Sequence, residues 1–78
     1  MSPMQCRMAR SALSLTTADL AALAGVGVNT VNRFEAGQDA RLSSVAKMQV
    51  ALEKAGVEFI AENGGGAGVR MKKRKRSN

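Results

Sequence analysis

The chain has 78 residues, of which 45% are hydrophobic and 23% charged. These values are typical of one small globular domain with a single core, a size that often gains stability by association. The sequence contains no His and one cysteine, Cys6. It therefore excludes a Ser–His or Cys–His dyad, a His-liganded metal site, an internal disulfide and a zinc knuckle. We expect no bound metal, no cofactor and no catalytic residues.

The formal net charge of +6 lies at one end of the sequence. Within residues 1–69, six basic residues balance six acidic residues, so this stretch is neutral. The excess comes from the basic residues that follow: Arg70, Lys72, Lys73, Arg74, Lys75 and Arg76. Such a run attracts polyanions, either nucleic acid or an anionic membrane surface. No apolar run approaches the ~20 residues of a membrane span and no signal-like segment is present, so we expect a cytoplasmic protein.

Two helices are predicted in the first third of the chain. A Pro suited to a first helical turn is followed by apolar residues spaced along one buried face: Pro3, Cys6, Ala9 and Leu13. Thr16 and Asp19 then have the spacing of a capping box, which predicts the start of a second helix. Apolar residues fill this helix between positions 20 and 24, and Gly25 ends it.

Two further helices are predicted between residues 28 and 56. The third covers residues 28–36, with Val31 and Phe34 facing inward, and Gly37 ends it. Residues 38–42 form a loop, after which Ser43 or Ser44 caps the fourth helix. An apolar stripe marks the buried side of that helix: Val45, Met48 and Leu52.

The alternation changes to a period of two from Val57 onward. Residues 57–60 predict a strand, and residues 69–71 predict its partner across a glycine-rich turn. Because an isolated two-stranded hairpin is barely stable in water, it must pack on the helices or pair with another chain. We expect a helical domain over 1–56, a hairpin over 57–71 and a disordered basic tail over 72–78.

The segment from Thr16 to Gly37 suggests a helix-turn-helix unit. Two helices that meet through a three-residue turn bring their backbones close together, which favours the small residues Ala21, Gly25 and Gly27. In the DNA-binding form of this unit, the second helix enters the major groove.

These residues resemble the lambda-repressor/Cro-like helix-turn-helix family, also called the XRE family. The matching pattern is Thr16-Thr17-x-Asp19-Leu20-Ala21-x-x-Ala24-Gly25-Val26-x-x-x-Thr30-Val31-x-Arg33-Phe34-Glu35-x-Gly37. Residues 56–66 also resemble a tail found in a bacterial subgroup of small regulators. The resemblance implies a mainly α fold of four to five helices with a short C-terminal strand or hairpin.

The function that the resemblance implies is sequence-specific regulation of transcription. A homodimer, acting as a repressor or autoregulator, would bind a pseudo-palindromic operator in double-stranded DNA. The protein would then be bacterial and associated with the nucleoid, and a place on a mobile genetic element is typical of small members.

The resemblance also assigns DNA contacts to individual residues. Base edges would be met by Val28, Asn29, Asn32 and Arg33. Phosphates would be met by Thr16, Thr17, Gly27, Thr30 and Arg41, and by the basic residues Lys72, Lys73, Arg74, Lys75 and Arg76. Two positions depart from the family pattern. Thr17 replaces a longer Gln, and Gly27 replaces a capping Ser or Thr and so supplies no hydroxyl to the DNA backbone.

Two structural roles complete the prediction. The family commonly pairs an arginine of its first helix with the glutamate that ends its recognition helix, which implies an ion pair between Arg10 and Glu35. The strand residues Val57, Phe59 and Ile60 are the predicted dimer contact, although the same hairpin could instead cap its own domain.

Three other functions compete with DNA binding. The first alternative is a protein-interaction module, such as an antitoxin or a co-regulator with a regulatory protein partner. Such a module should expose an apolar patch beyond the strand, and the sequence predicts none. Membrane binding through the tail lacks an adjoining amphipathic anchor, so we expect no membrane partner. An enzyme is the least favoured, because no nucleophile has a base.

Overall fold

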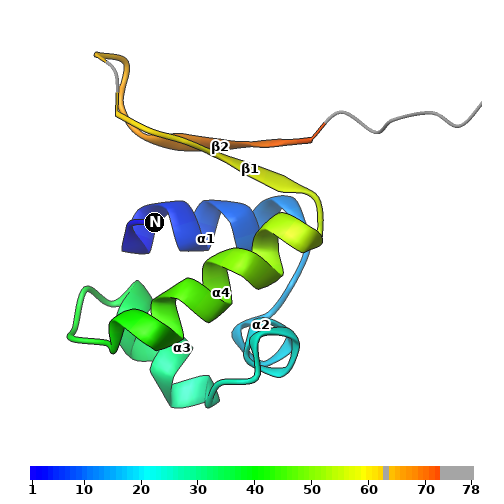
Figure 1. Ribbon diagram of the computed structural model, residues 1–78, viewed down its shortest axis with the longest axis vertical. Helices are drawn as coiled ribbons and strands as arrows, with labels where there is room; N and C mark the ends of the chain where they lie inside the picture. The colour runs from blue at the N-terminus through cyan, green and yellow to red at the C-terminus, as the bar shows by residue number, and fades with distance from the viewer. Residues whose placement is uncertain (63, 73–78) are drawn as a thin grey trace, which may run out of the picture.

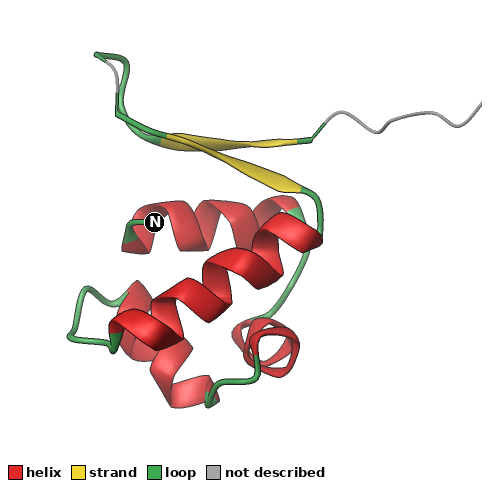
Figure 2. Cartoon of the chain, in the orientation of Figure 1, coloured by secondary structure: helices red, strands yellow, loops and turns green. Residues whose placement is uncertain are grey.

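Four helices precede a two-stranded antiparallel hairpin in the computed structural model, which describes residues 1–62 and 64–72 (Figure 1, Figure 2). The elements are α1 (Pro3–Ala12), α2 (Thr17–Ala24), α3 (Val28–Glu35), α4 (Leu42–Lys54), β1 (Val57–Ile60) and β2 (Gly68–Met71). The predicted mainly helical class with a C-terminal hairpin is therefore confirmed. None of the four helices combines the length and apolar character that a membrane span needs, within the residues described.

The first two helices begin with reciprocal side-chain caps. Ser2 and Gln5 form a capping box on α1, and the predicted box of Thr16 and Asp19 caps α2. In each case the cap satisfies a backbone N–H that has no partner within the helix. Gly25 ends α2 in the left-handed conformation at φ 70°, as its lack of a side chain allows.

The start of α4 corrects the sequence-based prediction. Neither Ser43 nor Ser44 is the cap, because the helix begins at Leu42 and its N-cap residue is Arg41. The physical reason is tertiary. Ala40 packs against the core, and the chain turns into the helix directly after it, so both serines fall within the first turn.

The core lies between all four helices and the first strand. Its fully buried or nearly buried members are Cys6, Ala9, Leu20, Ala21, Val31, Phe34, Met48, Leu52 and Val57. Every predicted inward position on α3 is buried, whereas Leu23 of α2 is 58% exposed although the sequence placed it in an apolar run. Helix α2 therefore carries more apolar side chains than it buries in the core.

The hairpin packs on its own domain. Val57 of β1 has no exposed surface, and Phe59 and Val69 pack against the core. The Gln5 Nε2 amide donates to the Ile60 and Gly68 carbonyls, at 3.0 Å each, and so fastens both strands to α1. In Figure 1 the hairpin lies beyond α1 and α4, on the opposite side of the molecule from α3. Because Val57 belongs to the helical core, residue 56 is not a boundary between packing units.

Candidate nucleic-acid interface

A three-residue turn over positions 25–27 joins α2 to α3. The Val26 N–H donates to the Ala21 carbonyl at 3.0 Å, and the extended backbone of Gly27 leads directly into α3. Ala21 is 5% exposed at this junction. A larger side chain at Ala21 would press the two helices apart. The two glycines are not required for space, because an added Cβ would meet nothing within 4 Å at Gly25 and only Thr30 Oγ1, at 3.8 Å, at Gly27. Gly25 instead allows the positive φ of 70° at the end of α2.

The outward face of α3 holds all four predicted base-contacting residues. Within the helix, Val31, Phe34 and Glu35 are buried and hold it against the domain. The exposed members of the same helix are Val28, Asn29, Asn32 and Arg33. The structure therefore brings this set together on one surface, with two amide groups, one guanidinium and one branched apolar side chain.

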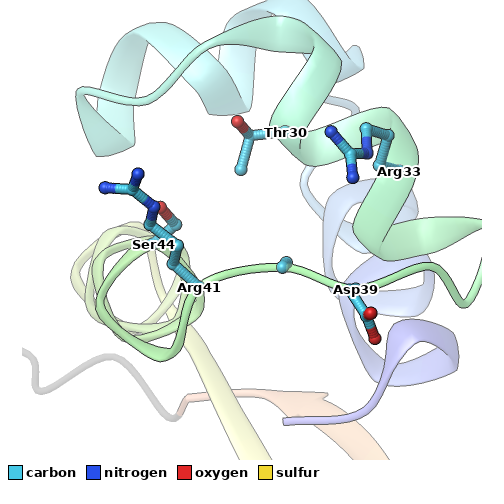
Figure 3. A pocket seen from close by; sticks show the side chains of 6 residues that line it. Thr30, Arg33, Asp39, Arg41 and Ser44 are labelled. Carbon is cyan, nitrogen blue, oxygen red and sulfur yellow. The ribbon is translucent and has the colours of Figure 1, made fainter.

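A polar hollow of about 640 Å³ lies between α3 and the start of α4 (Figure 3). Thr30 and Arg33 contribute from α3, and Arg41 and Ser44 contribute from α4 and the residue before it. In Figure 3 the Asp39 carboxylate points away from the space that these side chains surround. Two guanidinium groups and two hydroxyls make this hollow suited to an anionic group.

Three lining residues of the hollow were not predicted as site residues: Asp39, Ala40 and Ser44. Of these, Ser44 supplies a hydroxyl to the hollow. Its position in an expected cap suggested a purely local role. The signal that could have found it is its place in the first turn of α4, three residues after Arg41 on the same helical side.

The helices that wall the hollow begin without side-chain caps. The N-cap residues of α3 and α4 are Gly27 and Arg41, and neither side chain accepts a hydrogen bond from its helix. The Thr30 N–H is already occupied, because it donates to the Gly27 carbonyl at 3.0 Å. The other first-turn N–H groups of α3 and those of α4 have no acceptor on the side chain of their N-cap residue, in contrast to those of the capped α1 and α2. Such groups attract anions.

Glu35 anchors the C-terminal end of α3 to α1. Arg10 donates through Nε to Glu35 Oε2 at 2.9 Å and through Nη2 to Oε1 at 2.8 Å, which confirms the predicted ion pair. The Cys6 thiol donates to Oε2 at 3.3 Å, and Arg7 donates to the Glu35 carbonyl at 3.1 Å. The position of α3 is therefore fixed by three side chains of α1.

These contacts shift the pKa values of the cluster in opposite directions. Burial by itself raises the pKa of Glu35, but the hydrogen bonds from Arg10 and Cys6 and the nearby positive charges outweigh it, so the pKa falls below its usual value. Burial, helped by the neighbouring carboxylate, raises the pKa of Cys6 to about 12. Of these two acidic groups, Glu35 is thus ionised and Cys6 stays a neutral thiol.

The start of α2 is less open to a phosphate than predicted. The Thr16 hydroxyl already accepts from the Asp19 N–H at 3.0 Å, and the Asp19 carboxylate accepts from the Thr16 N–H. These bonds lower the pKa of Asp19, so a negative charge stays at this helix end. Thr17 is half-buried at the first position of α2.

The predicted basic contacts do not all lie on this surface. Lys72 follows β2 and donates through Nζ to the Glu53 carbonyl at 2.9 Å, near the end of α4. This bond holds the Lys72 ammonium at the C-terminal end of α4, beside the hairpin, which lies on the opposite side of the molecule from α3 (Figure 1). The other predicted tail contacts, Lys73, Arg74, Lys75 and Arg76, lie outside the described residues.

The predicted dimer contact is also divided by the fold. Val57 is fully buried, and Phe59 packs against the core of its own chain. Since side chains alternate along a strand, Ile60 lies on the other face of β1 together with Glu58. Of the three predicted residues, Ile60 alone keeps its side chain out of the core cluster.

No protein-family model matches the chain, and a search of curated proteins finds no significant match. Within residues 1–62 and 64–72, no group of three or more His, Cys, Asp or Glu side chains is arranged to hold a metal ion.

Proposed function

We propose that this chain is a sequence-specific regulator of transcription that binds double-stranded DNA through α3, as its resemblance to the lambda-repressor/Cro-like family implies. The observation that carries the proposal is the juxtaposition of the exposed α3 face with a cationic hollow beside it. In a DNA complex the first surface reads base edges, and the second holds the adjacent sugar–phosphate backbone.

The α3 side chains have the chemistry that major-groove readout needs. Asn29 can bond to adenine N6 and N7 together, and Arg33 can donate two hydrogen bonds to guanine O6 and N7. Val28, which is 41% exposed, offers an apolar contact to a thymine methyl group. Asn32 reads a base or bonds to a phosphate.

Phosphate binding in the hollow is supported by charge and by backbone geometry. Arg41 supplies a charge beside the uncapped start of α4, and Thr30 and Ser44 supply hydroxyls. The stretch 1–69 has no net charge. The orientation of the domain on DNA therefore depends on where its cations lie and less on its total charge.

A homodimer follows from the size of the reading element. With eight residues, α3 is about 12 Å long and covers only a half-site. Two copies on a pseudo-palindrome would place their α3 helices about 34 Å apart, one turn of DNA.

The part of β1 available to a partner is its outer face, with Ile60. The change Ile60→Asp should therefore lower the dimer fraction in sedimentation while circular dichroism stays unchanged, and an unchanged dimer fraction would reject this contact.

Selection of duplexes from a random pool at ~0.15 M salt, followed by sequencing, tests the proposed function. A two-fold symmetric enriched motif would support specific readout by a dimer, and a single enriched half-site would keep the readout but reject the dimer. Retention of DNA without any enriched motif would overturn the proposal.

Two variants make the selection specific to α3. Asn29→Ala should relax the preference at one position of the motif, because each bidentate pair discriminates by about 1–3 kcal/mol. Lys54→Ala, on the exposed side of α4, should leave the motif unchanged. If the motif survives Asn29→Ala, Asn32→Ala and Arg33→Ala alike, α3 is not the reading element.

A further inference from the structure

An apolar groove of about 370 Å³ lies between α2 and α4. Its walls are Leu23 of α2, which is 58% exposed, and Val50 of α4, which is 47% exposed. Small side chains form its base, among them Ala24 and Ala51, both of which pack on the core. The expectation that no apolar patch is exposed beyond the strand is therefore wrong. The reason is that Leu23 faces the gap between two helices and not the core.

The charges around the groove are all of one sign. Lys47 and Lys54 line it, seven positions apart on α4, with Val50 between them, and no lining residue is acidic. In the described part of the chain, the ion pairs join Arg10 to Glu35 and Arg70 to Glu58, so neither groove lysine is paired there. The groove thus offers two apolar walls and two unneutralised cations.

The sign of this charge selects the occupant. The basic residues at the end of this chain would be repelled by Lys47 and Lys54. A second copy seated symmetrically on the same groove would bring four lysines into one interface, and like charges at an interface oppose association. A partner with carboxylates beside its apolar side chains meets neither obstacle.

We propose that this groove docks an amphipathic helical segment of a partner protein, with large apolar side chains seated between Leu23 and Val50 and acidic side chains paired with Lys47 and Lys54. The recognition mode is a helix in a groove, with anchors one helical turn apart. None of the groove residues lines the hollow beside α3, so the two surfaces are made of separate residues. One molecule can therefore present both surfaces at the same time.

Selection from a displayed library of helical 16-residue peptides, without DNA, tests this inference. We expect enriched peptides to combine Leu, Met or Phe one turn apart with Asp or Glu on both sides. Against the variant Lys47→Glu/Lys54→Glu, the enriched charges should change to Lys and Arg. A synthetic peptide of the first selected type should lose about tenfold in affinity for this variant, the size that two exposed ion pairs provide.

A charge-matched variant separates this result from the proposed function. Arg33→Glu/Arg41→Glu changes the net charge equally but alters the hollow. This variant should lose duplex binding and still bind the peptide. Lys47→Glu/Lys54→Glu should bind the peptide about tenfold more weakly and still select the same DNA motif. Nuclear magnetic resonance titration with the peptide should shift Leu23 and Val50 first.

Four results would overturn the groove proposal. The first is that no peptide is enriched beyond those that also bind the Val50→Glu variant. The second is that the enriched peptides lack acidic residues, and the third is that both charge-reversed variants lose peptide affinity equally. The fourth is that the resonances of Leu23 and Val50 shift when the protein alone is diluted. The last result would mean that a second copy occupies the groove.

Discussion

Arg10 of α1 and Glu35 at the end of α3 are joined by two charge-assisted hydrogen bonds of 2.9 and 2.8 Å. Their side chains are 22% and 8% exposed, so the pair is shielded from solvent on its carboxylate side. It connects α1 to α3, the helix that presents the candidate DNA surface. The orientation of α3 therefore depends on α1 as well as on its own apolar face.

Loss of either partner of this pair should be costly. Glu35→Ala leaves the Arg10 guanidinium without its carboxylate, and we expect a loss of about 3 kcal/mol in the free energy of unfolding, measured by urea denaturation. The exposed pair of Glu58 and Arg70 is the control, with side chains 49% and 66% exposed. Arg70→Ala should cost at most about 1 kcal/mol. Equal losses in the two variants would contradict the anchoring role of Glu35.

Acid should destabilise the fold through the same carboxylate. The pKa of Glu35 is lowered in the folded state, so its stabilising contribution is complete above the ordinary value of 4.5 and is lost as the pH falls through the lower folded value. Glu35→Gln should make the unfolding free energy less dependent on pH below about 5. Some dependence should remain, because the pKa of Asp19 is also lowered. An identical pH profile for the variant would exclude Glu35 as an acid-sensitive group.

Removal of the Gln5 amide should loosen the hairpin. In Gln5→Leu the Ile60 and Gly68 carbonyls lose the donor that they share, which costs about 1–3 kcal/mol for groups left unsatisfied. Hydrogen exchange should accelerate in β1 and β2 more than in α3. Gln49→Leu is the control, because the Gln49 amide donates to Glu53 within α4 and, among the described residues, to no strand. Equal acceleration in all elements would mean that Gln5 supports the whole core and not the hairpin.

Cys6 should resist alkylation until the protein unfolds. Burial raises its pKa to about 12 from an ordinary 9.0, so the folded thiolate fraction near pH 8 is about a thousandfold smaller. The rate of iodoacetamide labelling should fall accordingly and recover in urea. Since the folded pKa is the higher one, this thiol contributes stability below pH 9 and loses it as the pH rises toward 12. Rapid labelling of folded protein at pH 8 would contradict the burial of Cys6.

Arg33 and Arg41 should differ in how they affect DNA binding. Arg33→Ala should weaken binding to the selected motif more than to random duplex, because a base contact carries sequence information. Arg41→Ala should weaken both and reduce the slope of log affinity against log salt by about 0.9, the value for one phosphate. Filter binding across a salt series measures both effects. The same salt slope in Arg41→Ala and the unaltered protein would exclude a phosphate contact.

Capping residues and helix-ending glycines in the sequence predict most helix ends correctly. The Thr16–Asp19 box, the left-handed Gly25 and the uncapped Gly27 each depend on residues within one or two turns, and each lies where the sequence placed it. The inward α3 positions also follow from spacing alone, because a short helix beside a core has one buried side. The Arg10–Glu35 pair is different, since it joins residues 25 positions apart and was predicted through the family resemblance.

The residue pattern alone predicts the four helices, the hairpin, the exposed side of α3 and the contrast between the neutral stretch 1–69 and the basic residues after it. Tertiary contacts set the start of α4 at Leu42, the place of Val57 in the core and the bond from Lys72 to the end of α4. The hollow at Ser44 and the groove at Leu23 belong to this second group. Each requires two helices to lie side by side, and the apolar period of one helix does not specify which neighbour covers its flank or where a gap stays open.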